Sequence, residues 1–215
     1  WSLFDPYEVQ KKYGKCLEDH FEKEFDDFYA ILEADKTLEM KKVIKAKDLF
    51  KQFLKTTVET GMPYVFYRDT VNKLNPNKHA WKIYSTQLCT EICQNSSPAS
   101  FIEEVIEDGK IVIRYEPGEV VTCNISSINV AKVYEEKEIE VALAVLSRIL
   151  DNIITLSKFP IKAAEMTAGK YRSIGIGYLG LAEYLATRSM AYDSLEAREH
   201  VDALFEKYTY YTYKA

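Results

Sequence analysis

The sequence predicts an α/β protein with a mixed sheet, and three observations lead to this prediction. Strand-like and helix-like segments alternate along the 215 residues, which is typical of α/β folds. Asp108-Gly109 separates two β-rich runs, at residues 101–107 and 110–115, and so predicts an antiparallel hairpin. Apolar residues recur at helical spacing over residues 139–153 and predict a long core helix.

The composition indicates a globular protein, with 47% hydrophobic and 28% charged residues. A net charge of -5 argues against a basic nucleic-acid-binding surface. Four cysteines in a chain of this length do not indicate a disulfide scaffold, so we expect a reducing, cytoplasmic location. No signal peptide is recognisable, and the most apolar run, residues 139–156, contains Glu140, Arg148 and Asp151. We therefore expect no membrane span.

The first part of the chain, up to residue 77, predicts two helices. The expected elements are an extended start broken by Pro6, a helix through residues 21–32, a helix from Ala46 that ends at Gly61, a short strand at residues 64–67 and a turn region at residues 69–77. Gly61 and Pro63 are typical helix-stop residues. The chain begins without Met and ends within a helical pattern. We expect residues 1–215 to be a single region from the middle of a longer protein.

The second part alternates strands with helices. After the hairpin we expect a strand at residues 120–125, the long helix, a short helix from Pro160 to Ala168, a strand at residues 172–177 and a helix at residues 179–190. Asp193 and Glu196 form a capping box that predicts the start of the last helix.

Residues 84–91 predict a short strand that runs into a loop and carries the candidate site. Gln87, Cys89 and Glu91 stand at alternate positions, so an extended backbone would turn an amide, a thiol and a carboxylate to one side. A buried strand end with an inert cysteine is the alternative. Cys123 follows 34 positions later, again beside polar residues. The two thiols would fit a common polar cavity.

Two other motifs could indicate a binding site. The sequence from Gly175 to Gly180 matches G-x-G-x-x-G, with Asp193 18 residues beyond Gly175, and would suit a dinucleotide-binding module. The preceding strand is short and Asp193 begins a helix, so these glycines more simply allow close packing. Cys89 and Cys93 with only three histidines in the chain predict no metal site.

Six motifs occur in an order that resembles the large (alpha) subunit of class I ribonucleotide reductase. They are Trp1-Ser2-Leu3-Phe4-Asp5-Pro6, Gly61-Met62-Pro63-Tyr64, Asp69-Thr70-Val71-Asn72 with Asn75-Pro76, Gln87-Leu88-Cys89-Thr90-Glu91, Thr122-Cys123-Asn124-Ile125-Ser126-Ser127-Ile128-Asn129, and Arg172-Ser173-Ile174-Gly175-Ile176-Gly177-Tyr178-Leu179-Gly180-Leu181. The resemblance covers essentially the whole chain. It implies part of a ten-stranded α/β barrel with an inserted hairpin.

The resemblance also implies residue roles in ribonucleoside-diphosphate reduction. Cys89 matches the cysteine that becomes a thiyl radical and abstracts the ribose 3′ hydrogen, and Glu91 matches the carboxylate that takes the 3′-hydroxyl proton. Cys123 matches one of two thiols that reduce the 2′ carbon and end as a disulfide. Gln87 stands where the family usually has Asn, which hydrogen-bonds the substrate hydroxyls.

The implied partners lie outside this chain. The family obtains its radical from a metal-containing small (beta) subunit, uses a thioredoxin- or glutaredoxin-like dithiol reductant, and forms a homodimer of the large subunit. We expect no cofactor bound by this chain and no turnover by the chain alone, because the second redox cysteine and the diphosphate-binding loop match no residues here. A non-catalytic structural or interaction domain is the remaining alternative.

Overall fold

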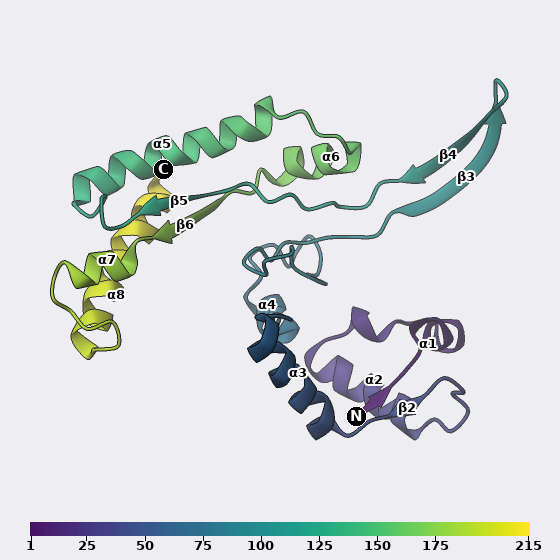
Figure 1. Cartoon of the computed structure of the whole chain (residues 1–215). Helices are drawn as coiled ribbons and strands as arrows, with labels where there is room; N and C mark the ends of the chain where they lie inside the picture. Colours follow the sequence, from purple (N-terminus) through teal and green to yellow (C-terminus); the bar gives the residue numbers. More distant parts are fainter. The chain divides into compact units, whose positions relative to one another are not determined.

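The computed structural model describes residues 1–215 and contains two compact units, residues 1–96 and 97–215. The first unit contains, in chain order, β1 (Ser2–Leu3), α1 (Pro6–Tyr13), the 3₁₀ helix η1 (Leu17–Asp19), α2 (Glu22–Ala34), β2 (Lys42–Val43), α3 (Ala46–Thr60) and α4 (Arg68–Leu74). The second contains β3 (Ser100–Glu107), β4 (Lys110–Glu116), β5 (Ile125–Asn129), α5 (Glu136–Leu156), α6 (Lys162–Tyr171), β6 (Gly175–Leu179), α7 (Leu181–Ala186) and α8 (Leu195–Lys214) (Figure 1).

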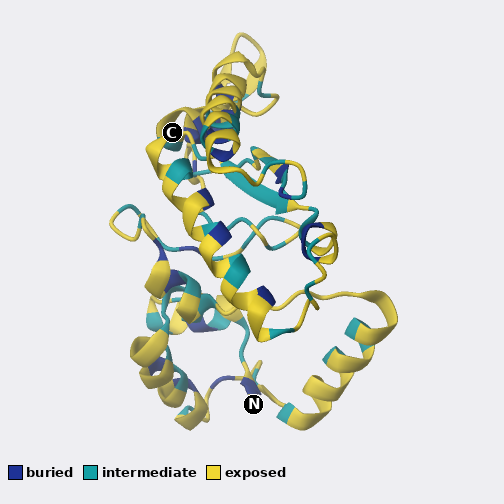
Figure 2. Cartoon of the chain, turned by 90° about the vertical axis from the view of Figure 1, so that its left-hand side faces the viewer, coloured by how far each residue is buried: buried dark blue, intermediate teal, exposed yellow.

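The first unit has a small apolar core. Its buried cluster joins α1, α2 and the segment before β2, and consists of Val9, Phe28, Leu32 and Leu38. The helix α3 begins and ends where the sequence predicts, with Gly61 in the left-handed conformation that glycine tolerates best. None of the α3 residues is buried, so its apolar stripe contributes nothing to this core (Figure 2).

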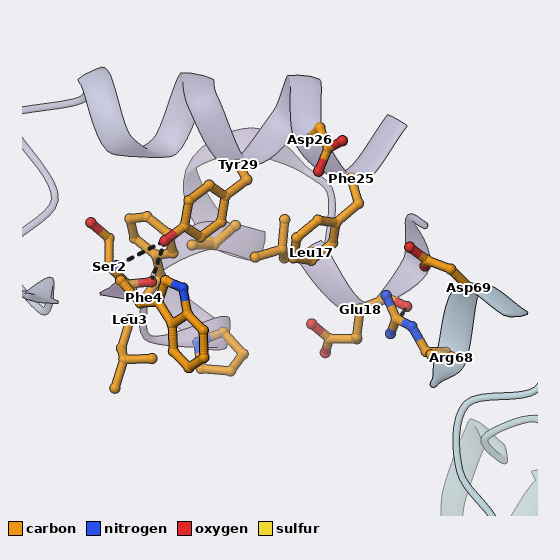
Figure 3. A pocket seen from close by; sticks show the side chains of 13 residues that line it. Ser2, Leu3, Phe4, Leu17, Glu18, Phe25, Asp26, Tyr29, Arg68 and Asp69 are labelled. Carbon is orange, nitrogen blue, oxygen red and sulfur yellow. Dashed lines mark hydrogen bonds between the residues drawn. The ribbon is translucent and has the colours of Figure 1, made fainter. Parts of the chain in front are cut away.

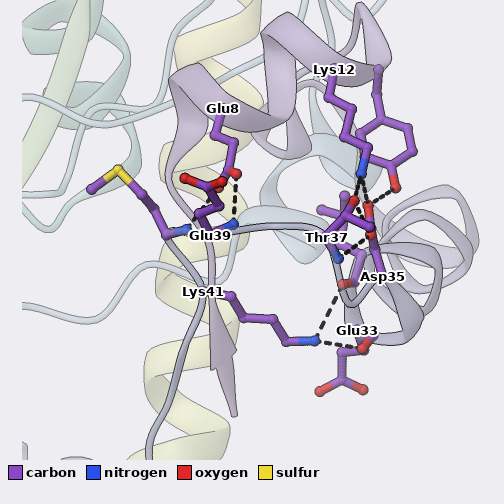
Figure 4. A network of polar contacts seen from close by, with 10 residues as sticks. Glu8, Lys12, Glu33, Asp35, Thr37, Glu39 and Lys41 are labelled. Atoms are coloured by element: carbon purple, nitrogen blue, oxygen red, sulfur yellow. Dashed lines mark hydrogen bonds and ion pairs between the residues drawn. The ribbon is translucent and has the colours of Figure 1, made fainter.

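Polar contacts supplement this core around residues 35–41. The Asp35 carboxylate accepts hydrogen bonds from Lys12, from the Tyr13 hydroxyl at 2.5 Å and from the Thr37 backbone N–H at 2.8 Å (Figure 4). The bonds from Lys12 and Tyr13 hold the pKa of Asp35 far below its usual range. The Glu8 carboxylate accepts the backbone N–H of Glu39 at 2.7 Å. These contacts tie the loop to α1.

The second unit is organised around a parallel strand pair. Strands β5 and β6 pair in register from Ile125 with Gly175 to Asn129 with Leu179. The adjoining core comes from β5, α5, α7 and α8, and its buried members are Ile128, Val130, Ile139, Leu143, Tyr184, Leu185, Ala197, Leu204 and Tyr208. The predicted long helix is confirmed, and its stripe is buried in part: Ile139, Leu143 and Leu150 are almost fully buried, whereas Ile149 and Ile153 are exposed.

The predicted mixed α/β class is confirmed. The pairs β1–β2 and β3–β4 are antiparallel and β5–β6 is parallel. The hairpin turns at Asp108 and Gly109, which both have positive φ as a tight hairpin turn requires. All three sheets are two-stranded and none is closed. No helix is long and apolar enough to cross a membrane.

Several predicted boundaries are wrong. Residues 64–67 and 84–91 form no strand, because no other segment pairs with them, and residues 68–74 form α4 instead of a turn. The strand expected at residues 120–125 begins only at Ile125, where β6 becomes available as a partner. Ser194, not Asp193, caps α8, and its hydroxyl accepts the Ala197 N–H.

Candidate active site

Cys89 lies on an exposed turn. The backbone N–H of Thr90 donates to the Gln87 carbonyl at 3.1 Å, and Thr90 has a positive φ of 72°. This turn breaks the alternation expected of a strand, so Gln87, Cys89 and Glu91 do not share one face through backbone pleating. Cys89 and Glu91 are both exposed, whereas Gln87 is partly buried. The turn therefore presents the thiol and the carboxylate to the outside.

Gln87 holds the turn closed. Its Oε1 accepts the backbone N–H of Ile92 at 3.0 Å, which spans the turn that carries Cys89. Its Nε2 is shielded from solvent and has no partner within the chain. Local side chain to backbone bonds of this kind compete with strand pairing. The Gln87 side chain therefore shapes the loop through Oε1, and its Nε2 is a hydrogen-bond donor without an acceptor in the chain.

Buried asparagines hold the segment that precedes the turn. Asn72 donates through Nδ2 to the Ile83 carbonyl and accepts the Ile83 N–H through Oδ1, each at 2.9 Å. Asn75 and Asn95 both donate to the Trp81 carbonyl. All three amides are less than 9% exposed, and buried amides that are fully paired specify one backbone path.

Sequence reasoning missed this supporting role. The residues Asn72 and Asn75 carry part of the family resemblance, yet the pattern places them in a turn region, whereas Asn72 lies in α4 and Asn75 directly follows that helix. Tyr84 adds a further tie, since its hydroxyl donates to Asp19 Oδ1 at 2.7 Å. Burial and this bond raise the pKa of Tyr84 to about 12.

Cys123 is exposed and lies two residues before β5. Its neighbour Asn124 donates through Nδ2 to the Leu150 carbonyl at 2.9 Å and accepts the Gly175 N–H through its backbone oxygen at 2.8 Å. These two bonds fix the segment to α5 and to the start of β6. Cys89 belongs to the first unit and Cys123 to the second, and their meeting in one cavity stays a prediction.

Two of the resemblance motifs form one substructure. The motif that contains Cys123 supplies β5, and the motif that contains Gly175 supplies β6. A Cβ on Gly177 would lie 2.8 Å from Ser127 Oγ, and one on Gly180 would lie 2.2 Å from Asn129 Oδ1. Gly180 also has φ of 80°, which favours glycine. The glycines therefore serve close packing against β5.

This placement disfavours the dinucleotide-binding alternative. Gly175 and Gly177 lie inside β6 instead of in a turn after it, and Gly180 immediately precedes α7. Asp193 lies just before Ser194, the N-cap of the last helix α8. In a dinucleotide-binding unit the acidic residue would instead follow a second strand. A phosphate-binding turn between a strand and a long helix is not formed here.

The other cysteines are more shielded. Burial raises the pKa of the Cys93 thiol, and burial together with Glu18 and Asp19 raises that of Cys16. Both therefore hold their protons more tightly than an ordinary thiol. No group of three or more His, Cys, Asp or Glu side chains is arranged to hold a metal ion.

A separate cavity of about 720 Å³ lies in the first unit. Its walls include Phe4, Phe25 and Tyr29, and Arg68 lies at the far end, where it donates to the Glu18 carbonyl at 2.7 Å (Figure 3). The Tyr29 hydroxyl accepts the Ser2 N–H at 2.7 Å. None of the predicted site residues lines this cavity.

An exposed thiol near an exposed carboxylate, on a turn held by buried amides, suits an α/β enzyme that uses thiol chemistry. Comparison with known proteins agrees with this class. The family model of the ribonucleotide reductase barrel domain matches residues 1–215. The chain belongs to the ribonucleotide reductase barrel-domain family.

Individual relatives agree with the family. The chain is 37% identical over 213 residues to a ribonucleoside-diphosphate reductase subunit alpha of Synechocystis sp., covering 98% of this chain and 25% of that protein. A subunit alpha of Helicobacter pylori is 33% identical, with 98% of this chain and 31% of that protein covered. The chain thus spans about a quarter to a third of these relatives.

A solved structure shares the fold. The alpha subunit of the Actinobacillus ureae class Id ribonucleotide reductase superposes with a TM-score of 0.61 and 25% identity, over 88% of this chain and 33% of that one. The match agrees with the mixed α/β fold, in which the three small sheets form no closed barrel.

Proposed function

We propose that this chain forms the central catalytic part of a ribonucleoside-diphosphate reductase large subunit. The observation that carries the proposal is the family match over all 215 residues, which include a cysteine and a carboxylate on one exposed turn. In the whole subunit the chain would contribute strands to a ten-stranded α/β barrel. The substrate would be a ribonucleoside diphosphate and the product its 2′-deoxy form.

Cys89 is the proposed radical carrier. As a thiyl radical it takes the hydrogen atom from the ribose 3′ carbon, so that the C–H bond breaks, an S–H bond forms and the radical moves to carbon. After the 2′ carbon has been reduced, the Cys89 S–H returns the hydrogen atom to the 3′ carbon and the thiyl radical forms again. Glu91 accepts the 3′-hydroxyl proton as general base. The exposed positions of Cys89 and Glu91 support this assignment, because both groups must reach a substrate that enters from outside the loop.

Cys123 is the proposed reductant, together with a second cysteine elsewhere in the complete subunit. The two thiols supply two electrons and two protons, the 2′ oxygen leaves as water, and the sulfurs join as a disulfide. An external dithiol of the thioredoxin or glutaredoxin kind then exchanges with that disulfide and restores the thiols. The exposed position of Cys123 just before β5 supports such exchange.

Gln87 is the proposed ligand of the substrate hydroxyls. Its Nε2 is a buried donor without a partner in the chain, while its Oε1 accepts the Ile92 N–H. A buried donor without a partner costs about 1–3 kcal/mol, and a substrate hydroxyl would remove that cost. The loop has to open slightly for this contact, because the amide nitrogen is shielded from solvent.

The proposed partners complete the reaction. A metal-containing small subunit supplies the radical, and the large subunit acts as a homodimer. The chain by itself would be inactive, because the second redox cysteine and the diphosphate-binding loop are expected elsewhere in the subunit.

Replacing Cys89 by Ser in the complete large subunit tests the central assignment. With the radical-generating small subunit and a dithiol reductant, we expect Cys89→Ser to abolish deoxyribonucleotide formation, because an alkoxyl radical is too costly to form. Cys93→Ser is the matched control, since this nearby thiol is partly buried and has no assigned role, and it should keep activity within a few-fold. Turnover by Cys89→Ser at the rate of the control would refute the proposal.

A further inference from the structure

The β3–β4 hairpin has one polar and one apolar face. Arg114 forms ion pairs with Glu103, at 2.9 Å, and with Glu107. These three residues and Lys110 lie on the polar face. Successive side chains along a strand point to opposite faces, and directly opposed residues of an antiparallel pair share a face. The residues that alternate with these four therefore lie on the other face. That apolar face consists of Phe101, Glu104, Ile106, Ile111, Ile113 and Tyr115.

The apolar face is uncovered. Its five large apolar side chains are between 53% and 80% exposed, and no residue of either strand is buried. In Figure 1 the hairpin extends away from α5 and α6 of its own unit. A contiguous exposed apolar face on an ordered element marks an interaction surface, since water contact with it is unfavourable.

The base of the hairpin is firmly held. The Glu119 N–H donates to Ser97 Oγ at 3.0 Å, and the Glu119 carboxylate accepts bonds from Lys170 and from the Tyr171 hydroxyl. Burial would raise the pKa of Glu119, but the bonds from Lys170 and Tyr171 outweigh it and lower this pKa. Val120 donates to Thr167 Oγ1 at 3.0 Å. These bonds tie the two segments that flank the hairpin to each other and to α6.

A second copy of the hairpin is a poor occupant of this face. Residues 100–116 carry five acidic and two basic side chains, so two hairpins would repel each other. The face is also small. It has six residues, whereas each partner of a stable complex contributes about 20–30 residues to the interface.

We propose that the apolar face is covered by a part of the same polypeptide outside residues 1–215, and that this part offers an apolar surface with a lysine or arginine. The relatives extend well beyond this region, since the chain spans 25% of the Synechocystis protein. A contact within one chain needs no association entropy, so a small apolar face suffices. The proposal depends on this longer polypeptide and not on the reductase activity.

Glu104 specifies the basic group. It lies opposite Ile113 on the apolar face, and its carboxylate makes no hydrogen bond or ion pair within the chain. Covering the face would remove this carboxylate from water, which is strongly unfavourable unless a cation pairs with it. The covering surface must therefore bring a positive charge to Glu104.

Photo-crosslinking in the complete gene product tests the occupant. A benzophenone side chain is placed at Ile111, on the apolar face, and in a control protein at Val112, on the polar face. We expect position 111 to link within one polypeptide to a peptide outside residues 1–215, at a yield independent of protein concentration and at least fivefold above position 112. Links between two copies or to a separate protein, equal yields at both positions, or a gene product confined to these residues would overturn the proposal.

A charge reversal tests the basic group. Glu104→Lys should lower the cross-link yield at position 111 several-fold, because two positive charges would then face each other. Glu116→Lys is the control, since Glu116 is exposed at the end of β4 and pairs with no cation. An unchanged yield in Glu104→Lys would overturn the assignment of a basic partner. Neither experiment uses turnover, so failure here leaves the proposed reaction untouched.

Discussion

The two candidate cysteines stand on supports of different construction. The Cys89 turn follows an irregular segment whose path is set by buried amides, in a unit with only four buried apolar residues in its core cluster. The Cys123 segment leads into β5, in a unit whose core cluster has nine buried residues. The first support depends on directional hydrogen bonds and the second on apolar packing. A substitution that weakens one support should therefore leave the stability of the other unchanged.

The largest expected effect comes from the apolar core of the second unit. Leu143→Ala removes a fully buried side chain of α5, and such truncations cost about 2–5 kcal/mol. We expect faster amide hydrogen exchange in β5, β6 and α8, with residues 81–95 unchanged. Val141→Ala, at a position 63% exposed on the same helix, should change stability by less than about 0.5 kcal/mol. Equal loss of protection around Ile83 would show that the two supports are coupled.

A smaller and local effect is expected in the first unit. Asn72→Ala leaves both the N–H and the C=O of Ile83 without their side-chain partner, at about 1–3 kcal/mol for buried groups. Amide exchange should accelerate at residues 81–92, and Cys89 should react faster with a thiol reagent as the turn loosens. Thr70→Ala, an exposed position on the same helix, serves as control. If exchange at Ile83 stays slow in Asn72→Ala, the amides do not set this path.

The smallest effect concerns alkaline pH and the second unit alone. Burial, with smaller contributions from Tyr178, Tyr184 and Glu138, raises the pKa of Tyr208 from 10.0 to about 12. The folded state therefore holds this proton more tightly than the unfolded state, so the contribution of Tyr208 is complete below pH 10 and is lost as the pH rises towards about 12.

Tyr208→Phe should remove that part of the alkaline loss of stability. At neutral pH the variant should lose about 1 kcal/mol, because the Val133 carbonyl loses the bond from the tyrosine hydroxyl. Urea titrations at pH 7 and pH 11 measure both effects. Tyr210→Phe, at a position 61% exposed, should follow the parent protein. A pH dependence identical in Tyr208→Phe and the parent would contradict the buried position.

The sequence by itself determined the features that depend on neighbouring residues. The turn at Asp108 and Gly109, the stop at Gly61 and the long helix α5 arise from local backbone preference or from periodicity within one helix, and all three are confirmed. The order of the motifs was enough to assign the family, because several weak patterns in one order are specific together. The roles of Gln87, Cys89, Glu91 and Cys123 stay predictions.

Only the tertiary structure decided the features that need a distant partner. A strand requires another strand, so β5 begins where β6 lies beside it, and residues 84–91 form no strand because nothing pairs with them. The pattern gave no sign that Asn72 bonds to Ile83, since an amide side chain finds its partner through space. Likewise, the close approach of Asn129 to Gly180, which leaves no room for a side chain there, is visible only in the tertiary structure. Local chemistry sets the elements, and contacts across the chain set their limits and the site they support.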